Sequence, residues 1–183
     1  MSPKQLYDNA INAGINGDFA TSVRLLSEAK SIDSANMPIL SALALANEAD
    51  LKQISKEAGV AVFQSINSGN KHHWNEALRY AKRACGLSAN SALLWVHIGT
   101  VYVGLIQAGK GDHYAGETIN AYKKAITIDS QNGLAYFNLG VAQAATRNWL
   151  EARINILKAK SLGIPVPAGL LSEIESRLKQ QKK

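Results

Sequence analysis

The chain has only one cysteine among its 183 residues. A single cysteine cannot form a disulfide within the chain, and a cysteine-based metal framework is excluded as well. The simplest interpretation is a protein of a reducing compartment, so we expect it to be cytoplasmic. Cys85 follows Ala84 in a helical apolar pattern, and we interpret it as a buried, inert thiol.

Charge is missing from the stretch 86–109, which contains no Asp, Glu, Lys or Arg. A uniformly apolar stretch of this length would be long enough to cross a membrane. His97, Thr100 and Gln107 interrupt it, and its Trp, Ile, Gly and Tyr residues have a helical spacing, so we expect no membrane span. The beginning of the chain, Met1 to Asn12, also lacks an apolar run, which predicts no secretory signal in the chain as given.

The charge balance is basic, with 20 Lys and Arg residues against 14 Asp and Glu and a net charge of +6. Such an excess can attract nucleic acid or another anionic partner. The basic residues are spread along the chain, so solvated outer helix faces explain them, and we do not expect nucleic acid as the main partner. The chain length and the 46% of hydrophobic residues are enough to bury one continuous core.

The most regular part of the sequence is residues 134–164, where two amphipathic helical patterns are joined by a turn at 146–148. The first pattern contains Tyr, Leu and Gly at positions 136, 139 and 140. An antiparallel helix pair of this kind cannot bury its apolar face alone, so it should recur along the chain. The second pattern places on one face Trp149, Ala152, Ile156 and Ala159.

The pattern does recur, with a period of about 34 residues, which is the spacing between Ala125 and Ala159. Residues 95–102 repeat the first-helix pattern with Trp, Ile, Gly and Tyr at the matching positions. In this period, and in its order of small and large residues, the chain resembles the tetratricopeptide repeat (TPR) family. The resemblance implies an all-α, right-handed solenoid of antiparallel helix pairs whose activity is binding.

We expect one solenoid domain over residues 1–183, with about four TPR-like repeats and a C-terminal capping helix. The second repeat is much longer than one period, and we interpret the excess as an extra helix at residues 50–67, capped by Asp50 with Gln53. The third repeat is also longer, and we place its excess in the turn at 107–113. The expected repeats are residues 3–34, 36–90 with the inserted helix, 91–130 with the inserted loop, and 132–165, followed by a cap at 167–180.

Motifs that could carry chemistry are weak. Residues 104–110 match the start of a phosphate-binding loop, but a glycine follows where a hydroxyl would bind magnesium, and a helix precedes the loop. His72, His73 and Glu76 offer a metal too few ligands, since adjacent histidines point in different directions. Cys85 has no histidine at a spacing that places it nearby. We therefore predict no enzyme, no metal and no cofactor.

The resemblance implies that the first helix of each pair lines a concave groove, where residues outside the packing signature contact a partner. We expect Val96 and Phe137 to be partly exposed there and to bind an apolar or amphipathic helical segment of another protein or peptide. Chaperone-binding members of the family clamp a carboxylate with lysine, asparagine and arginine, and of these only Asn138 stands at a matching place. The expected groove residues are Leu93, Val96, His97, Thr100 and Val103, and then Leu134, Phe137, Asn138, Val141 and Ala145.

Two alternatives stay open at this point. The extra helix or a neighbouring chain could fill the groove, and the second case makes the protein a homo-oligomer. Alternatively, the chain is an electrostatic binder of nucleic acid or an anionic surface through its basic outer helices, in which case binding weakens steeply with salt.

Overall fold

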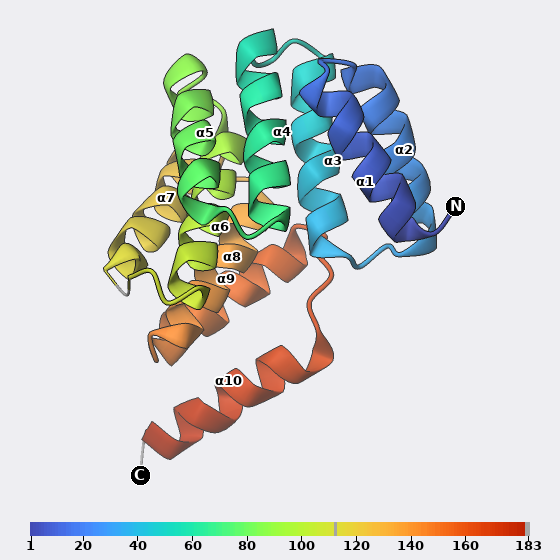
Figure 1. Ribbon diagram of the computed structural model, residues 1–183. Helices are drawn as coiled ribbons and strands as arrows, with labels where there is room; N and C mark the ends of the chain where they lie inside the picture. The colour runs from blue at the N-terminus through green and yellow to red at the C-terminus, as the bar shows by residue number, and fades with distance from the viewer. Residues whose placement is uncertain (112, 182–183) are drawn as a thin grey trace.

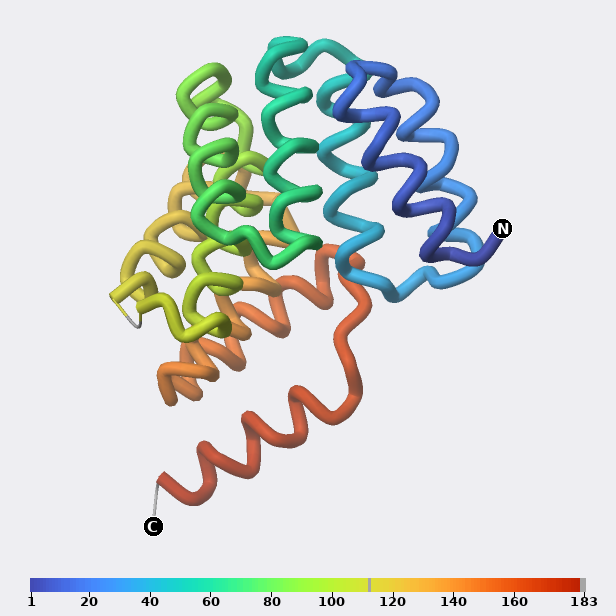
Figure 2. Tube along the Cα trace, in the orientation of Figure 1, coloured from blue at the N-terminus to red at the C-terminus, as the bar shows by residue number. Residues whose placement is uncertain are grey.

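The computed structural model describes residues 1–111 and 113–181, which form ten α-helices and no strand. The helices stack side by side into a curved array, with the two chain ends far apart (Figures 1 and 2). The all-α prediction is thus confirmed. The helices are α1 (Pro3–Ile15), α2 (Phe19–Ile32), α3 (Met37–Asp50), α4 (Lys56–Asn70), α5 (Trp74–Leu87), α6 (Ala92–Gln107), α7 (Tyr114–Ile128), α8 (Gly133–Ala145), α9 (Trp149–Ser161) and α10 (Ala168–Gln181).

Eight of these helices pack most closely as four sequential pairs, α1 with α2, α4 with α5, α6 with α7, and α8 with α9. Three pairs are joined by three-residue turns whose middle residue has a positive φ, namely Gly17, His72 and Arg147. The connection between α6 and α7 is longer and coincides with the insertion expected at 107–113. Of that insertion, Asp112 lies outside the described residues.

Small residues allow the two helices of a pair to approach each other. A Cβ atom added to Gly140 of α8 would lie 2.7 Å from Cγ1 of Ile156 and 3.1 Å from the carbonyl oxygen of Ala152. In the second pair, the Ser65 hydroxyl of α4 donates a hydrogen bond of 2.7 Å to the carbonyl oxygen of Ala77. The contact of Gly140 with Ala152 and the contact of Ser65 with Ala77 each join residues twelve positions apart. Ser65 therefore occupies in α4 the place that Gly140 occupies in α8.

This register corrects the prediction of the extra helix. Residues 36–90 do contain three helices, but α4 is the close partner of α5, and the added helix is α3 rather than residues 50–67. Helix α3 packs on α2 and also contacts α4 and α6 (Figure 1). The expected cap is also wrong, because Asp50 ends α3, whereas Ser55 caps α4 by accepting a hydrogen bond from the Ala58 amide. The division into four repeats stays a prediction.

Aromatic side chains lock neighbouring pairs together. The rings of Phe19 in α2 and Phe63 in α4 are stacked, with centroids 6.1 Å apart. The Trp74 indole covers Gly104 of α6 so closely that an added Cβ would lie 2.2 Å from its ring. Each ring thus fills space that a glycine or a neighbouring helix leaves open, and the stack is held by packing between pairs as well as within them.

Helix α10 closes the end of the array and matches the cap expected at 167–180. Ile174 of α10 is fully buried in a cluster with Phe137 of α8 and Ile156 of α9. The Arg153 side chain of α9 lies 3.4 Å from a Glu175 carboxylate oxygen. Trp149 is half-buried beside α10. The last pair is therefore covered as another repeat would cover it.

Ser22 carries a buried hydroxyl that finds no hydrogen-bond partner in the described part of the chain. It occupies in α2 the position that Ala77 and Ala152 occupy in α5 and α9. A buried polar group without a partner loses its hydration and gains nothing in return. We expect Ser22→Ala to raise the free energy of unfolding by about 1 kcal/mol. Ser65→Ala is the matched control, because it removes a paired hydroxyl and should lower stability, and urea denaturation distinguishes the two signs.

Candidate functional site

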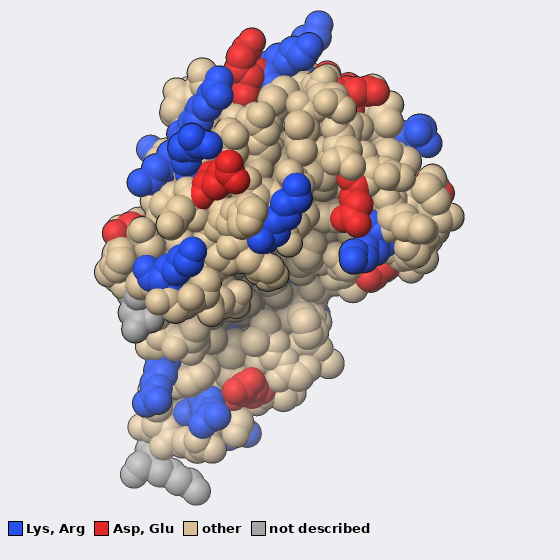
Figure 3. All heavy atoms as spheres, in the orientation of Figure 1, with Lys and Arg blue, Asp and Glu red and all other residues tan. Residues whose placement is uncertain are grey.

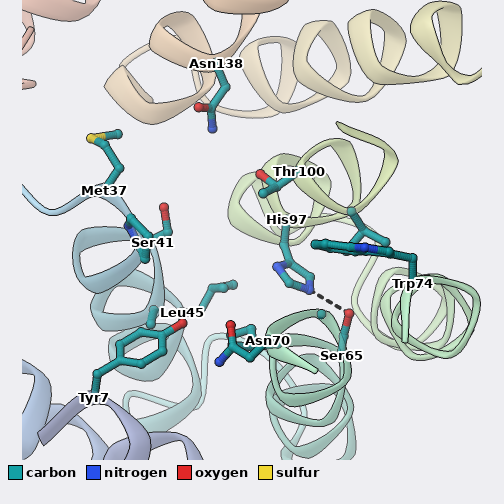
Figure 4. A pocket seen from close by; sticks show the side chains of 15 residues that line it. Tyr7, Met37, Ser41, Leu45, Ser65, Asn70, Trp74, His97, Thr100 and Asn138 are labelled. Atoms are coloured by element: carbon teal, nitrogen blue, oxygen red, sulfur yellow. Dashed lines mark hydrogen bonds between the residues drawn. The ribbon is translucent and has the colours of Figure 1, made fainter. Parts of the chain in front are cut away.

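The inner face of the array contains a pocket of about 300 Å³. Its walls come from α1, α3, α4, α6 and α8 and from Trp74 at the start of α5, six helices in all (Figure 4). The pocket is lined by Tyr7, Met37, Pro38, Ser41, Ala42, Leu45, Ser65, Ile66, Gly69, Asn70, Trp74, His97, Thr100, Val101 and Asn138.

No Asp, Glu, Lys or Arg side chain is among these lining residues. The apolar part of the wall includes Leu45 and the Trp74 indole, while polar side chains from α1, α3, α4, α6 and α8 surround the same space (Figure 4). A pocket of this composition offers hydrogen bonds and apolar contact but nothing to neutralise a full charge. It is thus suited to uncharged groups.

His97 is fixed in the pocket by a chain of two hydrogen bonds. Its Nε2 lies 2.8 Å from the Ser65 hydroxyl oxygen, and that hydroxyl donates its only proton to the carbonyl oxygen of Ala77. The Ser65 oxygen must therefore accept a hydrogen bond from Nε2–H of His97. Nδ1 of His97 then carries the free lone pair, and it faces the open space of the pocket (Figure 4).

The surroundings of His97 favour its neutral form. Burial lowers the pKa of His97 to about 4 from an ordinary value of 6.5, because a charged imidazolium would lose its hydration there. Since no carboxylate lines the pocket, nothing offsets that loss. At neutral pH the ring thus presents an acceptor to any molecule in the pocket.

The opposite wall is also held in place by polar contacts. Burial raises the pKa of Tyr7, and a hydrogen bond with Asn70 partly lowers it again. The Ser91 hydroxyl donates to the Glu48 carboxylate, which connects the C-terminal part of α3 to the beginning of α6. Burial raises the pKa of Glu48 and the bond from Ser91 opposes that shift. Helix α3 is thus anchored to α6 just beyond the part that lines the pocket.

The structure brings three of the ten predicted groove residues together, since His97, Thr100 and Asn138 all line the pocket. Leu93 and Leu134 lie in a separate depression beside Glu48. Val141 and Ala145 border another depression next to α10. Val103 is half-buried and lines neither the pocket nor either depression. The predicted exposure of the remaining two residues is wrong. They are buried, Val96 among side chains of α7 and α8 and Phe137 beneath α10.

Most of the pocket was missed from the sequence because α3 and α4 were assigned to the wrong roles. Ser65 and Asn70 belong to the first helix of a close pair, and Ser41 and Leu45 to the added helix. One signal could have revealed this. The twelve-residue spacing between Gly140 and Ala152 also separates Ser65 of α4 from Ala77 of α5.

Neither a protein-family model nor a curated protein matches the sequence. Several solved structures resemble the chain in fold, and two of them are described here. One is the TPR2AB-domain:pHSP90 complex of yeast Sti1, with a TM-score of 0.54, 17% identity, 99% of this chain covered and 70% of that chain. The other is MamA, with a TM-score of 0.50, 22% identity, and coverage of 83% of this chain and 92% of that one. This chain has the tetratricopeptide-repeat fold.

Within this TPR fold, the pocket lacks the basic side chains that a carboxylate clamp requires. Asn138 is present, but no Lys or Arg lines the pocket beside it. In residues 1–111 and 113–181, no group of three or more His, Cys, Asp and Glu is arranged to hold a metal ion. Among the same residues, no helix is both long and apolar enough to cross a membrane.

Proposed function

We propose that this TPR chain is a non-enzymatic protein-protein interaction module, and that its inner-face pocket receives uncharged side chains of an apolar or amphipathic partner segment. The observation that carries the proposal is the pocket itself, which has no charged lining residue and is built from six helices. The Sti1 structure, a TPR2AB-domain:pHSP90 complex, supports the use of this fold for binding another protein.

The size of the pocket narrows the proposal. Because α3 occupies part of the inner face, about 300 Å³ is open, which suits a few side chains rather than a whole helix. His97 adds a requirement for a hydrogen-bond donor in the partner, since its free Nδ1 accepts hydrogen bonds. We therefore expect the bound segment to bring apolar groups and a neutral donor, such as an amide or hydroxyl, into the pocket.

The basic outer surface supports an electrostatic partner less well. On the face drawn in Figure 3, Lys and Arg side chains are scattered and Asp and Glu lie among them. On α5, the Arg79 guanidinium lies 3.5 Å from the Glu76 carboxylate. Binding through such a surface would depend strongly on salt, whereas binding in the pocket would not.

A displayed library of random peptides, selected against the full chain, tests the proposal. We expect selected peptides to be poor in charged residues at the positions that matter for binding. Ser41→Arg places a charge inside the pocket and should weaken their binding at least about thirtyfold, measured by fluorescence anisotropy, since an unpaired charge there is costly. Ser27→Arg, on the exposed side of α2, is the matched control and should leave affinity nearly unchanged.

Two results would refute the pocket as the binding site. In the first, Ser41→Arg and Ser27→Arg bind the selected peptides equally well. In the second, neutralising Arg79, Lys82 and Arg83 together abolishes binding, which would transfer the function to the basic surface of α5.

A further inference from the structure

The second helices of the four pairs share one buried pattern. In each helix three residues, spaced four and then three positions apart, are buried against the first helix of the pair. The residue two positions before each buried one lies on the opposite side of the helix and points outward. These buried sets are Ser22, Leu26 and Ala29 in α2, Ala77, Ala81 and Ala84 in α5, Thr118, Tyr122 and Ala125 in α7, and Ala152, Ile156 and Ala159 in α9.

The outward positions differ sharply between α9 and the other three helices. In α9 they are Leu150, Ile154 and Leu157, with 57%, 49% and 39% of their surfaces exposed. In the other helices the same positions are also exposed, yet none carries a large apolar residue. Those residues are Ala20, Arg24 and Ser27 in α2, Asn75, Arg79 and Lys82 in α5, and Gly116, Asn120 and Lys123 in α7.

The α9 stripe, defined as Leu150, Ile154 and Leu157, is thus an apolar surface that the fold does not require. Three equivalent helices reach the same packing with polar or small residues there. A contiguous apolar stripe on an exposed helix face is typical of a contact with another molecule. Helix α10 does not cover it, because α10 packs over the side of α9 that carries Arg153.

The charges beside the stripe indicate which molecule fits. Glu151 and Lys158 lie along the same edge of the stripe, and their midpoint falls beside Ile154, close to the centre of the apolar residues. Neither makes a salt bridge within residues 1–111 and 113–181. If a second α9 packed antiparallel on the first, Glu151 of each copy would face Lys158 of the other. The stripe is therefore complementary to itself in charge as well as in apolar character.

We propose that the α9 stripe is a self-association surface, at which two copies of this chain pack their α9 helices antiparallel about a two-fold axis. Such an isologous contact uses the same residues of both copies. It is possible here because the apolar stripe and the Glu151–Lys158 pair are both centred near Ile154, where the two-fold axis would pass. The pocket is on the inner face of the array and takes no part in this contact.

The size of the stripe sets the expected strength. A stable dimer buries about 800 Å² on each partner, and three partly exposed side chains offer less than that. We expect a concentration-dependent dimer with a dissociation constant on the order of tens to hundreds of micromolar. A weak dimer of this kind forms where the chain is concentrated locally.

Sedimentation velocity of the full chain, from about 5 to about 500 µM, tests the proposal across this range. The wild-type chain should change from monomer to dimer, whereas Ile154→Asp should stay monomeric. Ile32→Asp is the matched control, because Ile32 is a comparably exposed isoleucine at the end of α2 and should leave the dimer intact. Circular dichroism should show unchanged helicity for both variants.

Charge exchange tests the antiparallel arrangement. Glu151→Lys alone and Lys158→Glu alone each place like charges opposite each other and should weaken the dimer at least about fivefold, while the double exchange should restore it. A chain that is monomeric at every concentration would overturn the proposal, as would equal effects of Ile154→Asp and Ile32→Asp. A double exchange no better than the single ones would overturn the antiparallel arrangement. Peptide binding in the pocket should be the same in all these variants.

Discussion

Phe137→Ala should lower the free energy of unfolding by about 3 to 5 kcal/mol, the usual cost of removing a large buried aromatic side chain. Phe137 is 9% exposed and packs in one cluster with Ile156 and Ile174, which join α8, α9 and α10. Truncation leaves a cavity where three helices meet, and α10 loses part of the surface that holds it. Chemical denaturation followed by circular dichroism measures the change.

Val141→Ala on the same helix provides the control. Val141 is 40% exposed, so its truncation should cost well under about 1 kcal/mol. Suppose instead that Phe137→Ala cost as little stability as Val141→Ala but weakened peptide binding. Phe137 would then be an exposed anchor of the kind expected from the sequence. The cluster described here would then be wrong.

Lowering the pH from 6.5 to 4 should destabilise the protein by up to about 3 kcal/mol through His97 alone, at about 1.4 kcal/mol per pKa unit. In the unfolded chain His97 takes up a proton below its ordinary pKa of 6.5, but in the folded chain only below a pKa of about 4. Between these values the unfolded state binds more protons, so stability rises with pH. Below pH 4 His97 makes no further contribution to the pH dependence.

Comparison with His97→Gln isolates this effect from other titrating groups. Glutamine retains an N–H donor for Ser65 but does not titrate, while carboxylates such as Glu48 are common to both proteins. The difference in urea midpoint between the two proteins should therefore shrink or reverse as the pH falls through the same range. An equal loss of stability in both proteins would show that His97 is hydrated or charged in the folded state.

The sequence predicts the helix pairs well where the small residues of its pattern are glycine and alanine. Gly140 with Ala152 identifies the last pair, and helix α9 begins and ends where the spacing from Trp149 to Ala159 indicates. The pattern failed where Ser65 replaces the glycine. Serine is not one of the small residues by which the repeat pattern is recognised. Only the hydrogen bond from Ser65 to the carbonyl oxygen of Ala77 shows that serine fits at this close helix contact.

The candidate site was harder to predict because it depends on α3. His97, Thr100 and Asn138 were identified from the resemblance of α6 and α8 to first helices. Burial of Phe137 and Val96 depends on how neighbouring helices are placed, which repeat spacing does not specify. Ser41 could not be predicted as a site residue, because it belongs to the added helix α3. No periodic pattern indicates on which face of the array an added helix will lie.

Helix α3 also changes how the chain should unfold. In a regular repeat array each unit contacts only its neighbours, and stability is close to a sum of local terms. Helix α3 contacts α2 and α4, and it reaches α6 as well, while Met37 at its start packs among side chains of the C-terminal clusters. Loss of this one helix removes support from every pair at once. The array is therefore expected to melt as a single cooperative unit rather than fray from its ends.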